Sequence, residues 1–180
     1  MPDEINFDPT EVSRWRPWRL LQAAMDKDIA RLYDEAKIDG VKTSFVMELI
    51  RLHARGPMTI TELADSVERT HSGTSQKVAE MRAAGLVRTT TGADARSKQI
   101  VLTAKARRLV GRLAAEWRAT EAAVAEIEAE IPYPLTQVTR DIEAALQRKS
   151  FHDRIAEKLA ANPAWSDPHQ PPPPPPRTAR

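Results

Sequence analysis

One stretch of the chain, residues 58–103, constrains the fold more than any other. Its pattern predicts a short helix, a tight connection, a second helix and a two-stranded hairpin, in that order. The short helix begins after Thr59 or Thr61, and Glu62 follows Thr59 at the spacing of a capping box. Its apolar face is made by Leu63, Ala64 and Val67. A helix this short needs the neighbouring elements to bury that face.

The second helix of this stretch has its own start and stop signals. Thr70 is a good N-cap residue, with Ser72 as the alternative, and Gly85 stands where a C-cap glycine is expected. Three residues at steps of four and three are predicted to face inward: Thr74, Val78 and Met81.

The opposite face of this helix carries small or hydrogen-bonding side chains and one cation. Its members are His71, Ser72, Gly73, Ser75, Gln76, Lys77 and Ala79. Glu80 is the only acidic residue nearby. Short side chains allow close approach to the edges of bases in a DNA major groove, and a glutamine can read adenine there. The pattern therefore predicts a DNA-recognition helix.

The hairpin follows directly. Residues 86–91 are rich in strand formers, residues 92–95 supply the turn, and residues 99–102 form the return strand. The first strand carries Arg88, and the segment just past the tip carries Arg96 and Lys98. An arginine near such a tip suits a narrow minor groove, which concentrates negative potential. Helix, turn, helix and hairpin together predict a winged helix-turn-helix.

The same stretch resembles the DNA-binding lobe of the MarR family of transcriptional regulators. The matching residues are Leu63-Ala64, Gly85-Leu86-Val87, Asp94-x-Arg96 and Leu102-Thr103. The resemblance implies that Arg96 enters the minor groove and that Asp94 helps to hold the wing in shape. It also implies a homodimer whose terminal helices interlock, and a small phenolic or lipophilic acid as effector.

Four positions depart from the pattern of that family. Glu68 stands where a turn glycine is common, and Thr74 and Lys77 stand where apolar residues are common. Ala106 replaces a common glycine in the helix after the wing.

The distribution of charge agrees with a nucleic-acid partner. Residues 69–112 hold ten Lys or Arg and two acidic residues, a balance of +8, so a net charge of +2 leaves −6 for the rest of the chain. A basic excess that coincides with a recognition motif is typical of a DNA-binding face.

The flanking segments predict a helical lobe made from both ends of the chain. Residues 15–40 and 104–160 are expected to form it, residues 41–103 to form the DNA-binding lobe, residues 1–14 a flexible arm, and residues 161–180 a proline-rich tail. Within the lobe we expect a first helix from about Trp18, one long helix ending near Ile131, and one last helix from about Leu135 to Leu159. Their apolar stripes exceed what one small domain can cover, which favours a homodimer.

Four side chains near the two lobes are candidates to contact an effector: Trp18, Tyr33, His53 and Trp117. For the tryptophans the alternative is ordinary packing, and for His53 it is a helix C-terminal cation.

No catalytic constellation is present, and the chain has no Cys. We therefore expect no enzyme activity, cofactor, metal site or disulfide framework. The amino-terminal residues do not look like a signal peptide and no long apolar run occurs, so we expect a cytoplasmic protein without membrane contact. The function predicted is a dimeric regulator, repressor or activator, of a palindromic DNA site. The alternative is a winged-helix protein-interaction module without DNA binding.

Overall fold

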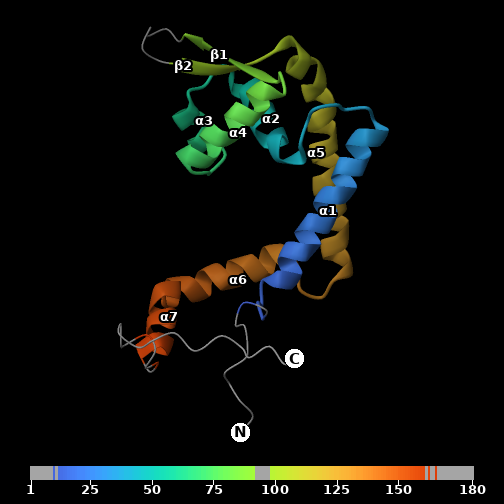
Figure 1. Ribbon diagram of the computed structural model, residues 1–180. Coiled ribbons are helices and arrows are strands. Elements are labelled where there is room, and N and C mark those ends of the chain that lie inside the picture. The colour runs from blue at the N-terminus through green and yellow to red at the C-terminus, as the bar shows by residue number, and fades with distance from the viewer. Residues whose placement is uncertain (1–9, 11, 92–97, 161, 163–164, 166–180) are drawn as a thin grey trace, which may run out of the picture. The chain divides into compact units, whose positions relative to one another are not determined.

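The computed structural model describes residues 10, 12–91, 98–160, 162 and 165 (Figure 1). This part of the chain is mainly helical with one two-stranded antiparallel sheet, which confirms the predicted class of a winged helix-turn-helix. The elements are α1 Arg16–Glu35, the 3-10 helix η2 Thr43–Phe45, α2 Val46–Arg55, α3 Ile60–Ser66, α4 His71–Ala83, β1 Val87–Thr91, β2 Lys98–Leu102, α5 Ala104–Glu130, α6 Leu135–Arg148 and α7 Phe151–Ala160.

Internal contacts divide the described residues into two compact units. One unit is Pro17–Val124, and the other holds the described parts of residues 1–16 and 125–180. The first unit contains the whole winged helix together with α1 and most of α5. The lobes expected from the sequence depend on a second copy of the chain, so their boundaries remain a prediction.

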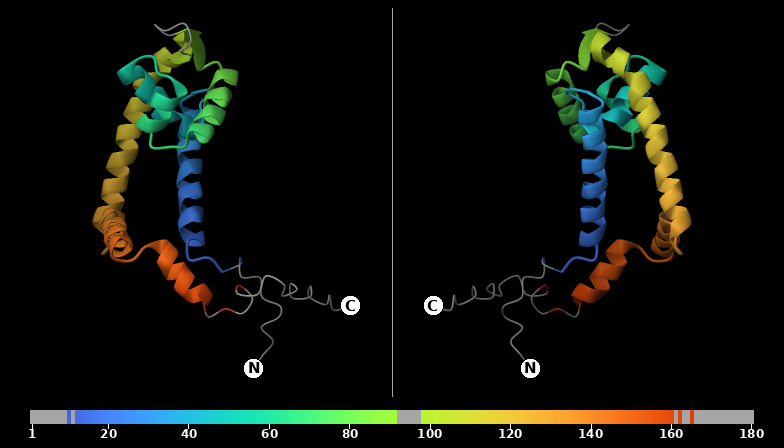
Figure 2. Two further views of the ribbon diagram at one scale, coloured as in Figure 1. Left: turned by 90° about the vertical axis from the view of Figure 1, so that its left-hand side faces the viewer. Right: turned by 90° about the vertical axis from the view of Figure 1, so that its right-hand side faces the viewer.

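The winged-helix unit is built on an aliphatic core. Its fully buried apolar side chains come from α2, α3, α4, the segment before β1, and α5, and include Leu49, Leu63, Met81, Leu86 and Leu113. The hairpin lies at one end of the unit beyond α3 and α4, whereas α1 and the first part of α5 extend away from it (Figure 2). This core holds the outward face of α4 on a packed scaffold.

Both helices of the helix-turn-helix begin at threonine caps. The side-chain oxygen of Thr59 accepts a hydrogen bond from the backbone of Glu62 at 3.2 Å, and Glu62 accepts one from the backbone of Thr59 at 2.7 Å. The bond from the Thr59 backbone to the Glu62 carboxylate, and then a second bond from the Thr59 hydroxyl at 2.9 Å, lower the pKa of Glu62. Thr70 accepts from the backbone of Gly73 at 3.2 Å. The predicted capping box and the predicted Thr70 cap are confirmed.

The turn between α3 and α4 requires a left-handed residue. Glu68 has a φ of +52°, a region that glycine enters without steric cost and other L-residues enter at about 1–2 kcal/mol. The backbone amide of the next residue, Arg69, donates to the carbonyl of Ala64 at 3.0 Å, which fixes the turn. The sequence departure at Glu68 therefore carries backbone strain.

Replacing Glu68 with glycine is expected to relieve that strain. The gain is reduced by the larger entropy of glycine in the unfolded chain, so we expect the free energy of unfolding to rise by about 0.5–1 kcal/mol. Urea titration of the two proteins measures the difference. Glu68→Ala is the control, because it removes the same side chain but keeps the Cβ. If alanine stabilises as much as glycine does, the side chain of Glu68 is responsible and the backbone argument is wrong.

The hairpin is held at its base by residues outside the two strands. β1 pairs with β2 from Val87 opposite Leu102 to Thr91 opposite Lys98. Thr103 then donates to the carbonyl of Gly85 at 2.7 Å, and its side chain accepts from the backbone of Ala106 at 3.3 Å. One threonine thereby links the segment that follows α4 to the start of α5. Residues 92–97 of the predicted wing, with Asp94 and Arg96, lie outside the described residues.

The prediction of one last helix over 135–159 is wrong, because two helices occupy this segment. Lys149 has extended backbone angles, φ −156° and ψ 120°, which end α6. The hydroxyl of Ser150 then accepts from the backbone of Asp153 at 3.0 Å and caps α7. The five-residue step in the apolar pattern between Leu146 and Phe151 coincides with this break.

Apolar side chains remain exposed on helices of both units. In α1, Leu20 and Leu21 are more than half exposed. Neither α6 nor α7 contains a buried residue, and Ile142 and Phe151 are 38% and 62% exposed. Among the residues that the structure describes, no helix combines the length and the apolar character needed to cross a membrane.

Candidate nucleic-acid interface

The outward face of α4 is the centre of the candidate interface. His71, Ser72, Gly73 and Gln76 are exposed, and Ser75 is half-buried. The residues predicted to face inward, Thr74, Val78 and Met81, are all buried. The helix thus presents to solvent the short and hydrogen-bonding side chains that the sequence predicts there.

Gly73 belongs to the capping structure as well as to this face. A Cβ at this position would lie 3.1 Å from the side-chain oxygen of Thr70, which is the oxygen that accepts the Gly73 amide. Glycine therefore leaves room for the Thr70 cap. Because glycine has no side chain, it also adds no bulk to the outer surface of the first turn, and a ligand can approach the α4 N-terminus closely.

The predicted outward position of Lys77 is wrong. Its ammonium lies 2.7 Å from Oε1 of Glu48, and the side chain is only 15% exposed. Glu48 itself is completely buried in α2. A buried carboxylate requires a cation close by, and that requirement draws Lys77 toward α2.

Two further predicted contacts lie on the hairpin. Arg88 of β1 and Lys98 of β2 are both exposed. Within the described part of residues 69–112, the other exposed cations are Arg69, Arg82, Lys105, Arg107, Arg108 and Arg112. Two of these are engaged, since Lys105 donates to the carbonyl of Ala84 and Arg112 to that of Ala36. Among the described residues, the structure gives the remaining cations of this segment no such backbone contact, and the segment itself contains few acidic residues.

In the part of the chain that the structure describes, three of the residues predicted to contact an effector line different cavities: Tyr33, His53 and Trp117. Tyr33 is buried, and its hydroxyl donates to Glu116 at 2.9 Å; burial first, and then this carboxylate, raise the pKa of Tyr33 well above its usual range. His53 is exposed and lines a separate hollow near Arg107, and Trp18 is half-buried. Tyr33 thus ties α1 to α5.

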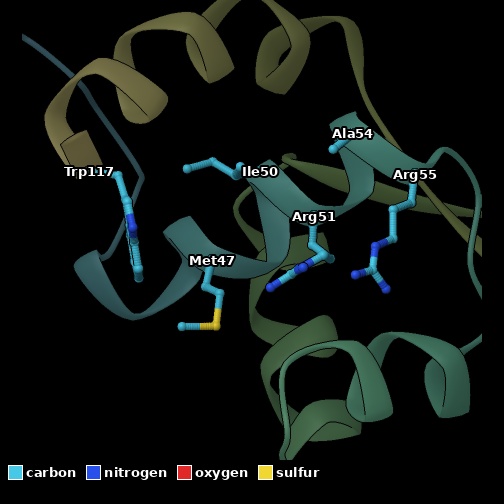
Figure 3. Close-up of a pocket in the computed structure, with 6 residues that line it drawn as sticks. All are labelled: Met47, Ile50, Arg51, Ala54, Arg55 and Trp117. Atoms are coloured by element: carbon cyan, nitrogen blue, oxygen red, sulfur yellow. The ribbon is translucent and has the colours of Figure 1, made fainter. Parts of the chain in front are cut away.

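Trp117 is the one predicted effector residue that lines a cavity with an aromatic and cationic character. This cavity has a volume of about 190 Å³ and is otherwise lined by α2 residues: Met47, Ile50, Arg51, Ala54 and Arg55 (Figure 3). Figure 3 shows Met47, Arg51 and Arg55 extending on the same side of α2. One ring-sized molecule fits this volume, and two guanidinium groups can bind an anionic group on it.

The sequence analysis missed Glu48, Arg51 and Arg55. For Glu48 a signal exists, because it falls on the apolar stripe of its helix, three residues after Phe45 and four before Leu52. An acidic residue on a core stripe predicts a buried carboxylate with a basic partner. No pattern in the sequence marks Arg51 and Arg55 as pocket residues. In the part of the chain that the structure describes, no group of three or more His, Cys, Asp or Glu is arranged to hold a metal.

A capped helix pair followed by a two-stranded wing defines a winged-helix fold, and its flanking helices make it MarR-like. Staphylococcus aureus MepR, solved as a DNA complex, is similar over 76% of this chain and 98% of its own, at 16% identity and a TM-score of 0.57. A MarR protein from Peptoclostridium difficile covers 84% of this chain and 99% of its own, at 17% identity and a TM-score of 0.53. The transcriptional regulator SlyA covers 81% and 99%, at 11% identity and a TM-score of 0.54.

At the level of sequence, residues 43–114 match a family described as HVO_A0114. No curated protein matches the chain. The matched residues run from the start of η2 into the first half of α5 and so contain the whole winged helix. The MarR-like fold that the sequence predicts is confirmed by the solved structures.

Proposed function

We propose that the chain is a sequence-specific, double-stranded-DNA-binding transcriptional regulator that acts as a homodimer on a palindromic site. The observation that carries the proposal is the outward face of α4, where exposed His71, Ser72, Gly73 and Gln76 stand on a capped, packed helix. Arg88 and Lys98 add exposed cations on the adjoining hairpin. MepR, which shares the fold, has been solved as a DNA complex, and this supports DNA binding as the function.

The dimer is supported by the exposed apolar side chains of α1, α6 and α7. A monomer that leaves Leu20, Ile142 and Phe151 in water loses hydrophobic stabilisation that a second copy would supply. In a two-fold dimer, the two α4 helices would enter successive major grooves, about 34 Å apart. The expected operator is therefore an inverted repeat with half-sites one helical turn apart.

Gln76 is expected to determine sequence preference. It is the longest uncharged hydrogen-bonding side chain on the exposed face of α4, and a glutamine can contact adenine through two hydrogen bonds. Gln76→Ala should change the preferred bases at one position of each half-site and lower affinity for the original site by about 1–3 kcal/mol. To measure the change in preferred bases, duplexes are selected from a random pool with the parent protein and with the variant. Identical selected motifs would exclude Gln76 as a base-reading residue.

Arg96 is expected to contribute affinity through the minor groove, as the resemblance implies. Arg96→Ala should weaken duplex binding by about 1–3 kcal/mol. Thr91→Ala, an exposed residue at the end of β1, is the control for a general effect on the hairpin. Titration of one selected duplex with the three proteins provides the comparison, and equal affinity of Arg96→Ala and the parent chain would refute the role of Arg96.

We also propose that a small effector regulates DNA binding. The cavity beside Trp117 offers an aromatic wall together with Arg51 and Arg55, which suits a small aromatic or lipophilic acid. Binding there would shift the population between dimer geometries that differ in DNA affinity. A thermal-shift screen of aromatic carboxylic acids tests this part, with Arg51→Ala as the variant that should lose any hit. A hit that survives Arg51→Ala unchanged would place the ligand elsewhere.

The alternative function, a protein-interaction module, predicts a different result when duplexes are selected and their binding is measured at several salt concentrations. A DNA-binding regulator should lose affinity steeply with salt, because its cations displace counterions from phosphates. A module without DNA binding should select no duplex at any salt concentration. Neither function requires catalysis, and we propose a non-enzymatic role.

A further inference from the structure

The buried ion pair beneath the recognition helix has an unusual composition for a core contact. Glu48 is completely buried, Lys77 is mostly buried, and their charged atoms are 2.7 Å apart. In the described part of the chain, the second carboxylate oxygen of Glu48 and the hydroxyl of Thr74 have no hydrogen-bond partner. Thr74 lies three residues before Lys77 on the same face of α4. The contact that the structure gives between side chains of α2 and α4 is therefore a buried ion pair.

Such a pair is a poor source of stability. Removing two charges from water costs about as much as their attraction returns, and apolar residues of similar volume stabilise equally well or better. An ion pair instead restricts how two helices can be oriented, because its hydrogen bond is favourable only within a narrow range of distance and angle. An aliphatic contact tolerates sliding and rotation.

Direction matters here because only a few other buried side chains on the inward face of α4 set the rotation of this packed helix. Besides Thr74 it contains only Val78 and Met81 as buried side chains. With side chains, a helix has a radius of about 5–6 Å, so a rotation of about 20° moves an outward side chain by about 2 Å. A displacement of that size breaks a hydrogen bond to a base edge.

We infer that the Glu48–Lys77 pair is a positioning device that sets the rotation of α4, and that it thereby determines operator discrimination without contacting DNA. This inference rests on the proposed DNA-binding function. Phosphate contacts tolerate small rotations of α4, whereas base contacts do not. Loss of the pair should therefore lower affinity for the preferred site more than affinity for unrelated duplexes.

The test compares two charge-neutral double variants of the full chain. Glu48→Leu with Lys77→Met removes the buried pair. Lys42→Met with Glu80→Leu removes the exposed pair that also links α4 to a neighbouring segment, with Nζ and Oε2 2.8 Å apart. Each variant loses one positive and one negative charge. The probes are a duplex selected by the parent chain and a scrambled duplex of equal length, and the readout is the ratio of the two affinities.

We expect the first variant to remain folded, with an unchanged or higher melting temperature, and to lose roughly 5- to 100-fold in that ratio, about the cost of one mismatched base pair. The exposed-pair variant should keep the ratio within about twofold. Glu48→Gln, which keeps the shape of the side chain, is the second variant and should lose at least about threefold.

A ratio within about twofold of the parent value in both folded buried-pair variants would overturn the inference while leaving the proposed function intact. A parent chain that selects no duplex would contradict the proposed function itself. A purely structural role for the pair would change the melting temperature and leave the ratio unchanged, so that outcome also counts against the inference.

Discussion

Lys77→Met is expected to destabilise the protein by about 3–5 kcal/mol, because it leaves the carboxylate of Glu48 buried without its cation. Glu48 has no exposed surface, and its other oxygen has no partner among the described residues. The loss should therefore exceed that of any surface charge in the chain. It should be largely recovered when Glu48→Leu is added, since the double variant has no buried charge.

Urea unfolding measures the free energy of unfolding of four proteins. They are the parent, Lys77→Met, Glu48→Leu and the double variant, which together form a double-mutant cycle. Lys42→Met is the matched control: it removes a lysine from an ion pair of similar length, but one whose side chains are 65% and 42% exposed. Exposed pairs contribute about 0.2–1 kcal/mol. A loss below about 1 kcal/mol for Lys77→Met would mean that water or rearrangement solvates Glu48 in the variant, and that the carboxylate does not depend on Lys77.

Ile142→Glu is expected to dissociate the proposed homodimer and to reduce duplex affinity by about 100-fold or more. Ile142 lies on the apolar seam of α6 with Leu135, Val138 and Leu146, and it is 38% exposed in one copy of the chain. A glutamate there would place an unpaired carboxylate in each half of the proposed interface, at a cost of several kcal/mol. A monomer binds only one half-site, so the affinity lost at the palindrome should be large.

Sedimentation velocity at micromolar protein gives the mass, and titration of the selected duplex gives the affinity. Gln147→Glu is the control, because it introduces the same charge on the polar side of α6, where Gln147 is exposed. The control should remain dimeric and bind normally. If Ile142→Glu also remains dimeric with full affinity, the seam of α6 is not part of the interface.

The winged helix was predictable because its local signals agree with each other. Thr59, Thr70 and Gly85 mark helix ends, and the inward spacing of Thr74, Val78 and Met81 matches their burial. Each of these signals acts within a few residues, which is the range over which propensity and capping operate. The break between α6 and α7 was visible only as a change of spacing, because Ser150 caps a helix that the apolar pattern alone continues.

The candidate site was less predictable than the fold. Lys77 was assigned to the outer face because it is not one of the apolar-spaced residues of α4, yet its position is decided by Glu48, a residue 29 positions earlier in the chain. The structure places Tyr33, His53 and Trp117 at three different hollows, so their joint contact with an effector stays a prediction. The contact between Glu48 and Lys77 joins elements far apart in sequence, which periodicity does not encode. The sequence does contain one signal for this contact, because Glu48 is an acidic residue on the apolar stripe of α2.

The central claim, that the exposed face of α4 reads a symmetric duplex, is tested most directly by selecting duplexes from a random pool and titrating the winner at several salt concentrations. The account predicts an inverted repeat with half-sites about 34 Å apart. It also predicts that log affinity falls steeply with log salt, with a slope of about −5 or steeper if six or more phosphates are neutralised. A pool that stays random after selection, or binding that salt leaves unchanged, would contradict it.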